Sequence, residues 1–298
     1  MKKWACFLAA LALIISASRA FATVQMRHED GRAVLLDGAW IQTAEEDPEL
    51  PAGTVYIGEL EENKLNGRGT LVFADGTVYT GDFYQGMKDG KGIMLWPDGS
   101  LYSGDFENDS MTGEGVFTLP DGSSYIGDFL HDQMTGKGKW IMPDGSYYIG
   151  DFVNAAMTGQ GAFYFENGEI YEGDFADGVK TGKGRFTFQN GDVYEGDFAS
   201  DVRTGKGKCR YTNGDIYEGD FVKGIRTGYG RFTWANGTVY EGRFVEGAMT
   251  GKAVITWTNG DVYEGDFQNG AMTGQGIFKG GDGTVYEGEF INGVFQDE

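Results

Sequence analysis

The chain has 298 residues and a formal net charge of −21, from 24 basic and 45 acidic residues. Such an excess of acid repels nucleic acid and anionic headgroups, which excludes a nucleic-acid partner and disfavours membrane association except at a local basic patch. With only two histidines and two cysteines, and no zinc spacing or nucleophile motif, the sequence predicts no catalytic residue, no metal and no cofactor.

Residues 1–22 have the features of an export signal. Two lysines precede an apolar run over residues 5–15 that is too short to span a bilayer, and residues 20–22, Ala-Phe-Ala, fit a small-x-small cleavage site. The alternative is a buried N-terminal helix, although the rest of the chain has no helical period to pack against it. Cleavage would leave one cysteine, Cys209, and a net charge of −24, because it removes three basic residues and no acid. We therefore expect an exported protein that is periplasmic or secreted.

Residues 23–55 are irregular in sequence. The run Glu-Glu-Asp-Pro-Glu at 45–49 is typical of a solvated linker. Within this segment, the apolar triplet at 34–36 together with Trp40 is a candidate capping strand that covers the first element of the following array.

From residue 56 onward the chain is a repeat of 23 residues. There are ten full repeats over 56–285 without insertion and a truncated eleventh over 286–298. Repeats of this kind cannot bury their apolar side chains alone, so they stack on their neighbours. Each repeat begins with a tyrosine: Tyr56, Tyr79, Tyr102, Tyr125, Tyr148, Tyr171, Tyr194, Tyr217, Tyr240, Tyr263 and Tyr286.

Each repeat, numbered from its tyrosine as position one, alternates with period two and is therefore predicted to be a β-hairpin. Tyr194, Gly196 and Phe198 share one face, and the two acids between them share the other. Asp or Asn followed by Gly at positions twenty and twenty-one marks the turn between the two strands. The pattern predicts an aromatic–glycine face and a charged face in every repeat.

The hairpin turn at Asn213-Gly214 is expected to be a three-residue loop in which Gly214 has a positive φ. A two-residue turn would place an acid on the aromatic face, whereas a three-residue loop keeps the faces matched. In this register each bulky ring faces a glycine. The expected pairs are Tyr211 with Tyr217, Cys209 with Gly219, and Gly207 with Phe221.

The pattern Tyr-x-Gly-(Asp/Glu)-Phe, Gly-x-Gly, aromatic-x-aromatic, (Asn/Asp)-Gly resembles the MORN (membrane occupation and recognition nexus) repeat family over residues 53–293. Arg243 at the acidic position and Gly280 at the aromatic position depart from it. The resemblance implies an all-β fold, an elongated and twisted single-layer antiparallel sheet of about ten stacked hairpins. It also implies scaffolding, peptide-binding or dimerising roles, with lipid binding proposed for some members. Enzymatic relatives carry a separate catalytic domain, for which we find no sequence, so we expect no enzyme.

The aromatic face has two interpretations, a hydrophobic core only or a core that also binds a partner. No second sheet or helix remains in the sequence to cover it, and contiguous exposed apolar surface usually marks an interface. The leading hypothesis is therefore an exported scaffold that binds a protein or peptide, or a second copy of itself as a homodimer, through an aromatic groove of partly exposed rings. The candidate groove residues are Tyr171, Tyr194, Tyr217, Tyr240, Tyr263, Phe188, Trp234 and Trp257.

A second candidate site is a basic edge at position ten, in what is expected to be the longer loop of each repeat. Lys180, Arg203 and Arg226 interrupt a series in which methionine is common. One interpretation is neutral drift among duplicated repeats. The other is an envelope- or membrane-surface module that binds anionic lipid or glycan through this edge.

Overall fold

The computed structural model describes residues 26–29, 32–35, 40–43, 54–62 and 64–296. Residues 1–22, predicted to be an export signal, lie outside the described residues. All regular structure in these ranges is β-strand, so they contain no helix long and apolar enough to cross a membrane. The chain divides into two compact units, Met1–Gln133 and Met134–Glu298, which are described separately.

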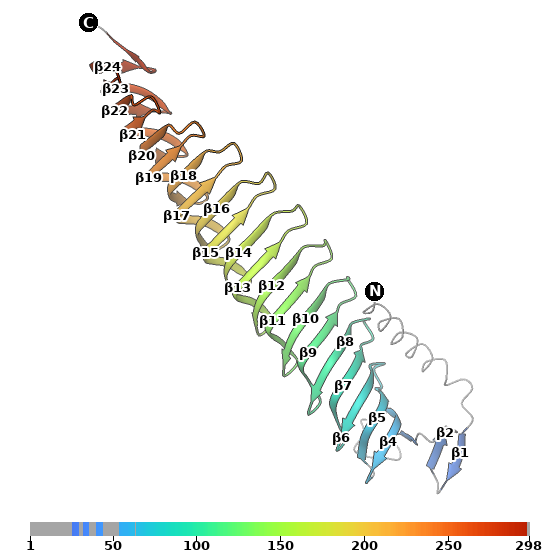
Figure 1. Ribbon diagram of the computed structural model, residues 1–298. Helices are drawn as coiled ribbons and strands as arrows, with labels where there is room; N and C mark the ends of the chain where they lie inside the picture. Colours follow the sequence, from blue (N-terminus) through green and yellow to red (C-terminus); the bar gives the residue numbers. More distant parts are fainter. Residues whose placement is uncertain (1–25, 30–31, 36–39, 44–53, 63, 297–298) are drawn as a thin grey trace. The chain divides into compact units, whose positions relative to one another are not determined.

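Unit 1 is an antiparallel array in which β4 to β10 pair in chain order (Figure 1). Its strands are β1 (Met26–Glu29), β2 (Arg32–Leu35), β3 (Trp40–Thr43), β4 (Val55–Glu61), β5 (Lys64–Val72), β6 (Val78–Tyr84), β7 (Met87–Leu95), β8 (Leu101–Glu107), β9 (Ser110–Thr118) and β10 (Ser124–Leu130). Trp40, expected in a capping strand, begins β3, which pairs with β4 from Trp40 opposite Gly58 to Thr43 opposite Val55. Its role as a cap stays a prediction.

Unit 2 continues the same design, and each strand pairs antiparallel with the next in a single layer (Figure 1). It holds nearly all of β11 (Gln133–Ile141), then β12 (Tyr147–Val153), β13 (Ala156–Tyr164), β14 (Ile170–Ala176), β15 (Val179–Thr187), β16 (Val193–Ala199), β17 (Val202–Arg210), β18 (Ile216–Val222), β19 (Ile225–Thr233), β20 (Val239–Val245), β21 (Ala248–Thr256), β22 (Val262–Gln268), β23 (Ala271–Lys279), β24 (Val285–Ile291) and β25 (Val294–Phe295). In both units the described repeats confirm the predicted single-layer sheet of stacked hairpins.

The connection between β17 and β18 is the predicted three-residue loop. The Tyr211 amide donates a 2.9 Å hydrogen bond to the Asp215 carbonyl, and Gly214 has φ +93°, as expected. The predicted register is wrong by two residues, because Cys209 faces Tyr217 and glycine faces glycine. Both registers keep the aromatic side chains on one face, so strand alternation alone does not distinguish them.

The second connection, between β16 and β17, is shorter than predicted. Ser200 and Asp201 have φ of +48° and +67° and form a two-residue turn between the paired Ala199 and Val202. Two left-handed residues match the twist of the flanking strands, so no longer loop is needed. Position ten, here Arg203, therefore lies within β17, opposite Phe198.

The core of each hairpin is its tyrosine. The Tyr194 side chain has no exposed surface, and its ring meets Phe198 at 5.3 Å and Phe221 of the next repeat at 5.1 Å in edge-to-face contacts. The tyrosine also lies over the paired glycines 196 and 207, where an added Cβ would come within 2.5 Å of its side-chain atoms. Glycine recurs at positions three and fourteen because the tyrosine occupies the space of a side chain there.

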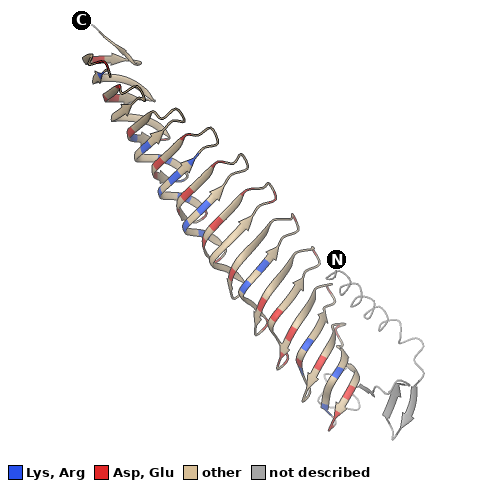
Figure 2. Cartoon of the chain, viewed as in Figure 1, with Lys and Arg blue, Asp and Glu red and all other residues tan. Residues whose placement is uncertain are grey.

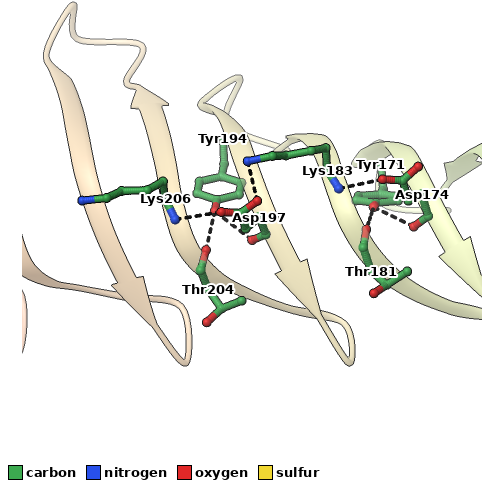
Figure 3. A network of polar contacts seen from close by, with 8 residues as sticks. All are labelled: Tyr171, Asp174, Thr181, Lys183, Tyr194, Asp197, Thr204 and Lys206. Atoms are coloured by element: carbon green, nitrogen blue, oxygen red, sulfur yellow. Dashed lines mark hydrogen bonds and ion pairs between the residues drawn. The ribbon is translucent and has the colours of Figure 1, made fainter.

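A polar network fixes a bulge beside this core (Figure 3). The ladder between β16 and β17 shifts after Gly196, which leaves Gly205 and Lys206 without partners on β16. One oxygen of the Asp197 carboxylate accepts a 2.9 Å hydrogen bond from the Lys206 backbone amide. The other carboxylate oxygen lies 2.5 Å from Nζ of Lys183 in the preceding repeat. The lysine ion pair and the backbone hydrogen bond hold the pKa of Asp197 below its usual range. The acid at position four therefore stabilises the bulge in addition to facing solvent.

The opposite face, here called the ionic face, carries cross-strand ion pairs in unit 2. Figure 2 shows basic and acidic positions on neighbouring strands. Arg185 pairs with Glu195, Lys206 with Asp220, and Arg231 with Glu241. In unit 1 the charged-face prediction is wrong for the row at positions two and fifteen, where Val116 and Ile126 are 40% and 39% exposed. That row reads Ile57, Thr70, Thr80, Ile93, Ser103, Val116 and Ile126 on successive strands.

Candidate binding groove

The tyrosines that the sequence places in the groove are not exposed. The structure contradicts the expectation of partly exposed tyrosine rings, because each side chain has 0% exposed surface. The phenylalanines of the same and the following repeat cover each ring, and the hydroxyl is directed at the backbone: that of Tyr194 donates to the Asp197 carbonyl at 3.0 Å. These side chains form the floor beneath any binding surface. They are Tyr171, Tyr194, Tyr217, Tyr240 and Tyr263.

The other three predicted groove residues, at position eighteen, are half-buried. Phe188, Trp234 and Trp257 directly follow their strands, just before the three-residue loop. Phe188 packs on Phe186 at 4.7 Å and Trp234 on Phe232 at 4.9 Å. Their rings remain accessible on the face where the tyrosines are covered, so this outer row is where a partner can touch aromatic carbon.

The basic residues do not form a separate edge. Position ten lies opposite the position-five phenylalanine, so Lys180, Arg203 and Arg226 are half-buried on the aromatic face itself. The Arg203 guanidinium carbon lies 5.1 Å from the Phe188 ring centre, and that of Arg226 lies 5.5 Å from the Phe232 ring centre. The prediction of two distinct sites is therefore wrong, since the cations and the rings belong to one surface.

A hollow of about 540 Å³ opens on this surface in unit 2. Phe188, Arg203 and Arg226 of the predicted sets meet there; Lys180, Trp234 and Trp257 do not line it. Tyr211 and the buried Cys209 contribute to the wall. Burial raises the pKa of the Cys209 thiol, which keeps it protonated and unreactive at neutral pH. The combination of aromatic carbon and guanidinium groups suits an anionic or amphipathic ligand.

The repeat unit is identified by a family model described as MORN repeat. It matches ten consecutive stretches of 23 residues from 56 to 285 and an eleventh at 286–296. The chain belongs to the MORN repeat family. The match covers every hairpin of the groove, so the hollow is built entirely from MORN repeats.

Two of the solved structures similar to the chain match it at low identity. The TCP10 domain of Danio rerio CPAP, in complex with a peptide of Danio rerio STIL, is 12% identical with a TM-score of 0.42, over 79% of this chain and 99% of that one. The SAS-4 (dCPAP) TCP domain of Drosophila melanogaster, in complex with a proline-rich motif of Ana2, is 14% identical with a TM-score of 0.32, over 59% and 90%. No significant match was found among curated proteins.

The residue at position ten of one MORN repeat contacts the residue at position eight of the next, and the residue types in this pair vary along unit 2. The Lys180 ammonium lies 3.4 Å from the Asp201 carboxylate. Where arginine replaces lysine, glycine replaces the aspartate: Nη2 of Arg203 donates to the Gly224 carbonyl and that of Arg226 to the Gly247 carbonyl, each at 3.2 Å. The two arginines therefore keep a backbone anchor but not the carboxylate.

Sequence reasoning did not place Tyr211, Gly224 or Gly247 in the site. Tyr211 carries a signal, because it stands at position eighteen of its repeat like Phe188. The glycines would have been found only by comparing position ten of one repeat with position eight of the next. That comparison requires knowing that these positions touch, which follows from the short turn at positions seven and eight.

Proposed function

We propose that this protein is an exported, non-enzymatic MORN scaffold that binds a protein or peptide on its aromatic face. The observation that carries the proposal is the half-buried row of position-eighteen rings, of which Phe188 and Tyr211 line a hollow together with two arginines. Aromatic and arginine side chains provide most of the binding energy in protein interfaces. The recurrence of near-identical hairpins supports a scaffold, since catalysis needs one special constellation of groups.

Replacing Phe188 and Trp234 by alanine is expected to weaken partner binding or self-association by at least about 2 kcal/mol, close to 30-fold in dissociation constant. Both rings are half-buried, so their loss removes contact surface while the tyrosine floor remains. Affinity is measured by calorimetry with a partner captured from the native envelope, and self-association by analytical ultracentrifugation.

The matched control is Tyr229→Ala, which removes a ring that is 64% exposed on the ionic face of the same unit. Circular dichroism must show the β-sheet signal intact in both variants. Full association by a folded double variant, with or without loss in the control, would contradict binding through the aromatic face.

Export predicts a mature N-terminus at Thr23, because the Ala-Phe-Ala site at residues 20–22 fits cleavage after Ala22. Intact mass measurement of protein recovered from the periplasm or medium is expected to give the mass of residues 23–298. Recovery of the chain with Met1 retained would remove the argument for export and for the periplasmic or secreted location.

Anionic lipid or glycan is the second candidate ligand. The observation in its favour is that Arg203 and Arg226 have no carboxylate within ion-pair distance among the described residues. Binding of this kind would weaken steeply with salt, whereas binding through the rings would change little.

A further inference from the structure

Arg203 and Arg226 differ from the lysines at position ten, because the next repeat offers them no carboxylate. Lys88 and Lys180 each have an aspartate of the next repeat within ion-pair distance, Asp109 at 3.9 Å and Asp201 at 3.4 Å. For the arginines that place is taken by glycine, and each guanidinium donates one Nη2 hydrogen bond to the glycine carbonyl. No carboxylate of the described residues pairs with either one.

The two guanidinium groups are held in place by packing. Arg203 lies over the Phe188 and Tyr194 rings at 5.1 and 5.4 Å, and Arg226 lies over Tyr217 and Phe232 at 5.5 Å each. A guanidinium has five donors in a planar fork, and the carbonyl bond uses one, so each group retains donors for a carboxylate. Stacking and the carbonyl anchor reduce the side-chain entropy that binding would otherwise cost.

The spacing of the two groups is set by the repeat. Both make the same anchor contact one repeat apart, and a repeat adds two strands, so they are about 9.6 Å apart along the sheet. A polyproline II segment rises about 9.3 Å in three residues and returns to the same side after three. In a β-strand, side chains on the same side are two or four residues apart, which is about 6.8 or 13.6 Å. Neither distance matches the separation of the two guanidinium groups.

From these observations we propose that Arg203 and Arg226 bind two carboxylate side chains placed three residues apart on a polyproline II peptide. This inference rests on the proposed function and names the chemistry of its ligand. Phe188 and Tyr211, which line the same hollow as the two arginines, would contact the apolar residues between the two acids. Two acids also line the hollow, Glu169 and Asp192. The Asp192 carboxylate accepts a hydrogen bond from the Thr212 amide at 2.8 Å, and the Glu169 carboxylate accepts one from the Asn167 side-chain amide at 3.1 Å.

The test uses Arg203→Met with Arg226→Met, because methionine occupies position ten in neighbouring repeats, as at Met157 and Met249. Calorimetry is done with three synthetic peptides that contain Asp-Pro-Pro-Asp, Asn-Pro-Pro-Asn or Asp-Pro-Pro-Pro-Asp. Wild-type protein is expected to bind the first at least about tenfold more tightly than the other two, and the double variant is expected to lose this preference. The control variant, Arg185→Ala with Arg231→Val, removes the same charge from the ionic face and is expected to keep it.

The outcomes separate this inference from the proposed function. Equal binding of all three peptides by wild-type protein would overturn the carboxylate pairing and leave the groove as a peptide site. If the control variant lost the preference for the first peptide equally, the preference would depend only on net charge, and the two-arginine site would be overturned. Phosphatidylserine vesicles that bind wild type but not Arg203→Met with Arg226→Met, while no peptide binds, would make lipid phosphate the ligand and overturn the peptide proposal.

Discussion

Tyr217→Ala is expected to destabilise its repeat by about 4 kcal/mol, the cost of a large cavity in a packed core. The ring has no exposed surface, lies in edge-to-face contact with Phe221 and Phe244 at 5.2 and 5.0 Å, and covers two glycines. Its hydroxyl donates to the Asp220 carbonyl at 3.1 Å. Tyr217→Phe keeps the ring and is expected to cost about 1–2 kcal/mol, because that carbonyl loses its side-chain donor.

The effect is measured by urea unfolding and by native-state hydrogen exchange, since repeats touch only their neighbours and the loss is local. Tyr229→Ala is the control: this tyrosine is 64% exposed and is expected to change stability by less than about 0.5 kcal/mol. Similar losses for Tyr217→Ala and Tyr229→Ala would show that the buried tyrosines are not the core of the repeats.

Gly196→Ala is expected to destabilise by about 3 kcal/mol, and Gly207→Ala, its cross-strand partner, by about 1 kcal/mol or less. A Cβ on Gly196 would lie 2.6 Å from both the Gly207 Cα and the Lys206 carbonyl oxygen, which are backbone atoms. That Cβ would also meet the Tyr194 hydroxyl, whereas the three atoms nearest to a Cβ on Gly207 all belong to the Tyr194 side chain. The chain already carries alanine at the place equivalent to Gly207, Ala253, opposite Gly242.

Thermal unfolding of the two single variants under the same buffer gives the comparison. Since both changes add one methyl group to the same pair of strands, they differ only in which atoms must move. A Gly207→Ala variant as unstable as Gly196→Ala would mean that the tyrosine ring is as immovable as the backbone.

The repeat length, the strands and the division into two faces could be predicted from the sequence, because alternation and a fixed period encode them. The loop at Asn213-Gly214 was also predictable, since its length follows from the need to match faces. The register was not, because a shift of two residues preserves both faces. The true register places Gly207 opposite Gly219 and lets the Tyr194 ring meet Phe221 of the next repeat, a tertiary contact that periodicity does not describe.

Tertiary contacts and turn geometry, which periodicity does not describe, also explain the errors in the candidate site. The lack of a second layer in the sequence indicates exposed tyrosine rings, but the phenylalanines of neighbouring repeats cover them. Arg203 was placed in a loop because the turn length was unknown; two left-handed residues at Ser200 and Asp201 put it in the strand, over the rings. The chemistry of the site was therefore visible in the sequence, while its placement depended on turn geometry.

Lys183 shows how neighbouring repeats are joined. Its amide donates to the Asp174 carboxylate of its own repeat at 2.7 Å, and its ammonium lies 2.5 Å from Asp197 in the next (Figure 3). Each such lysine is a link between two adjacent hairpins and reaches no further, so an unfolding front can stop at any junction. A ligand lying across several hairpins would join repeats that the chain itself connects only in adjacent pairs. Ligand binding would therefore make the unfolding transition sharper as well as raise its midpoint.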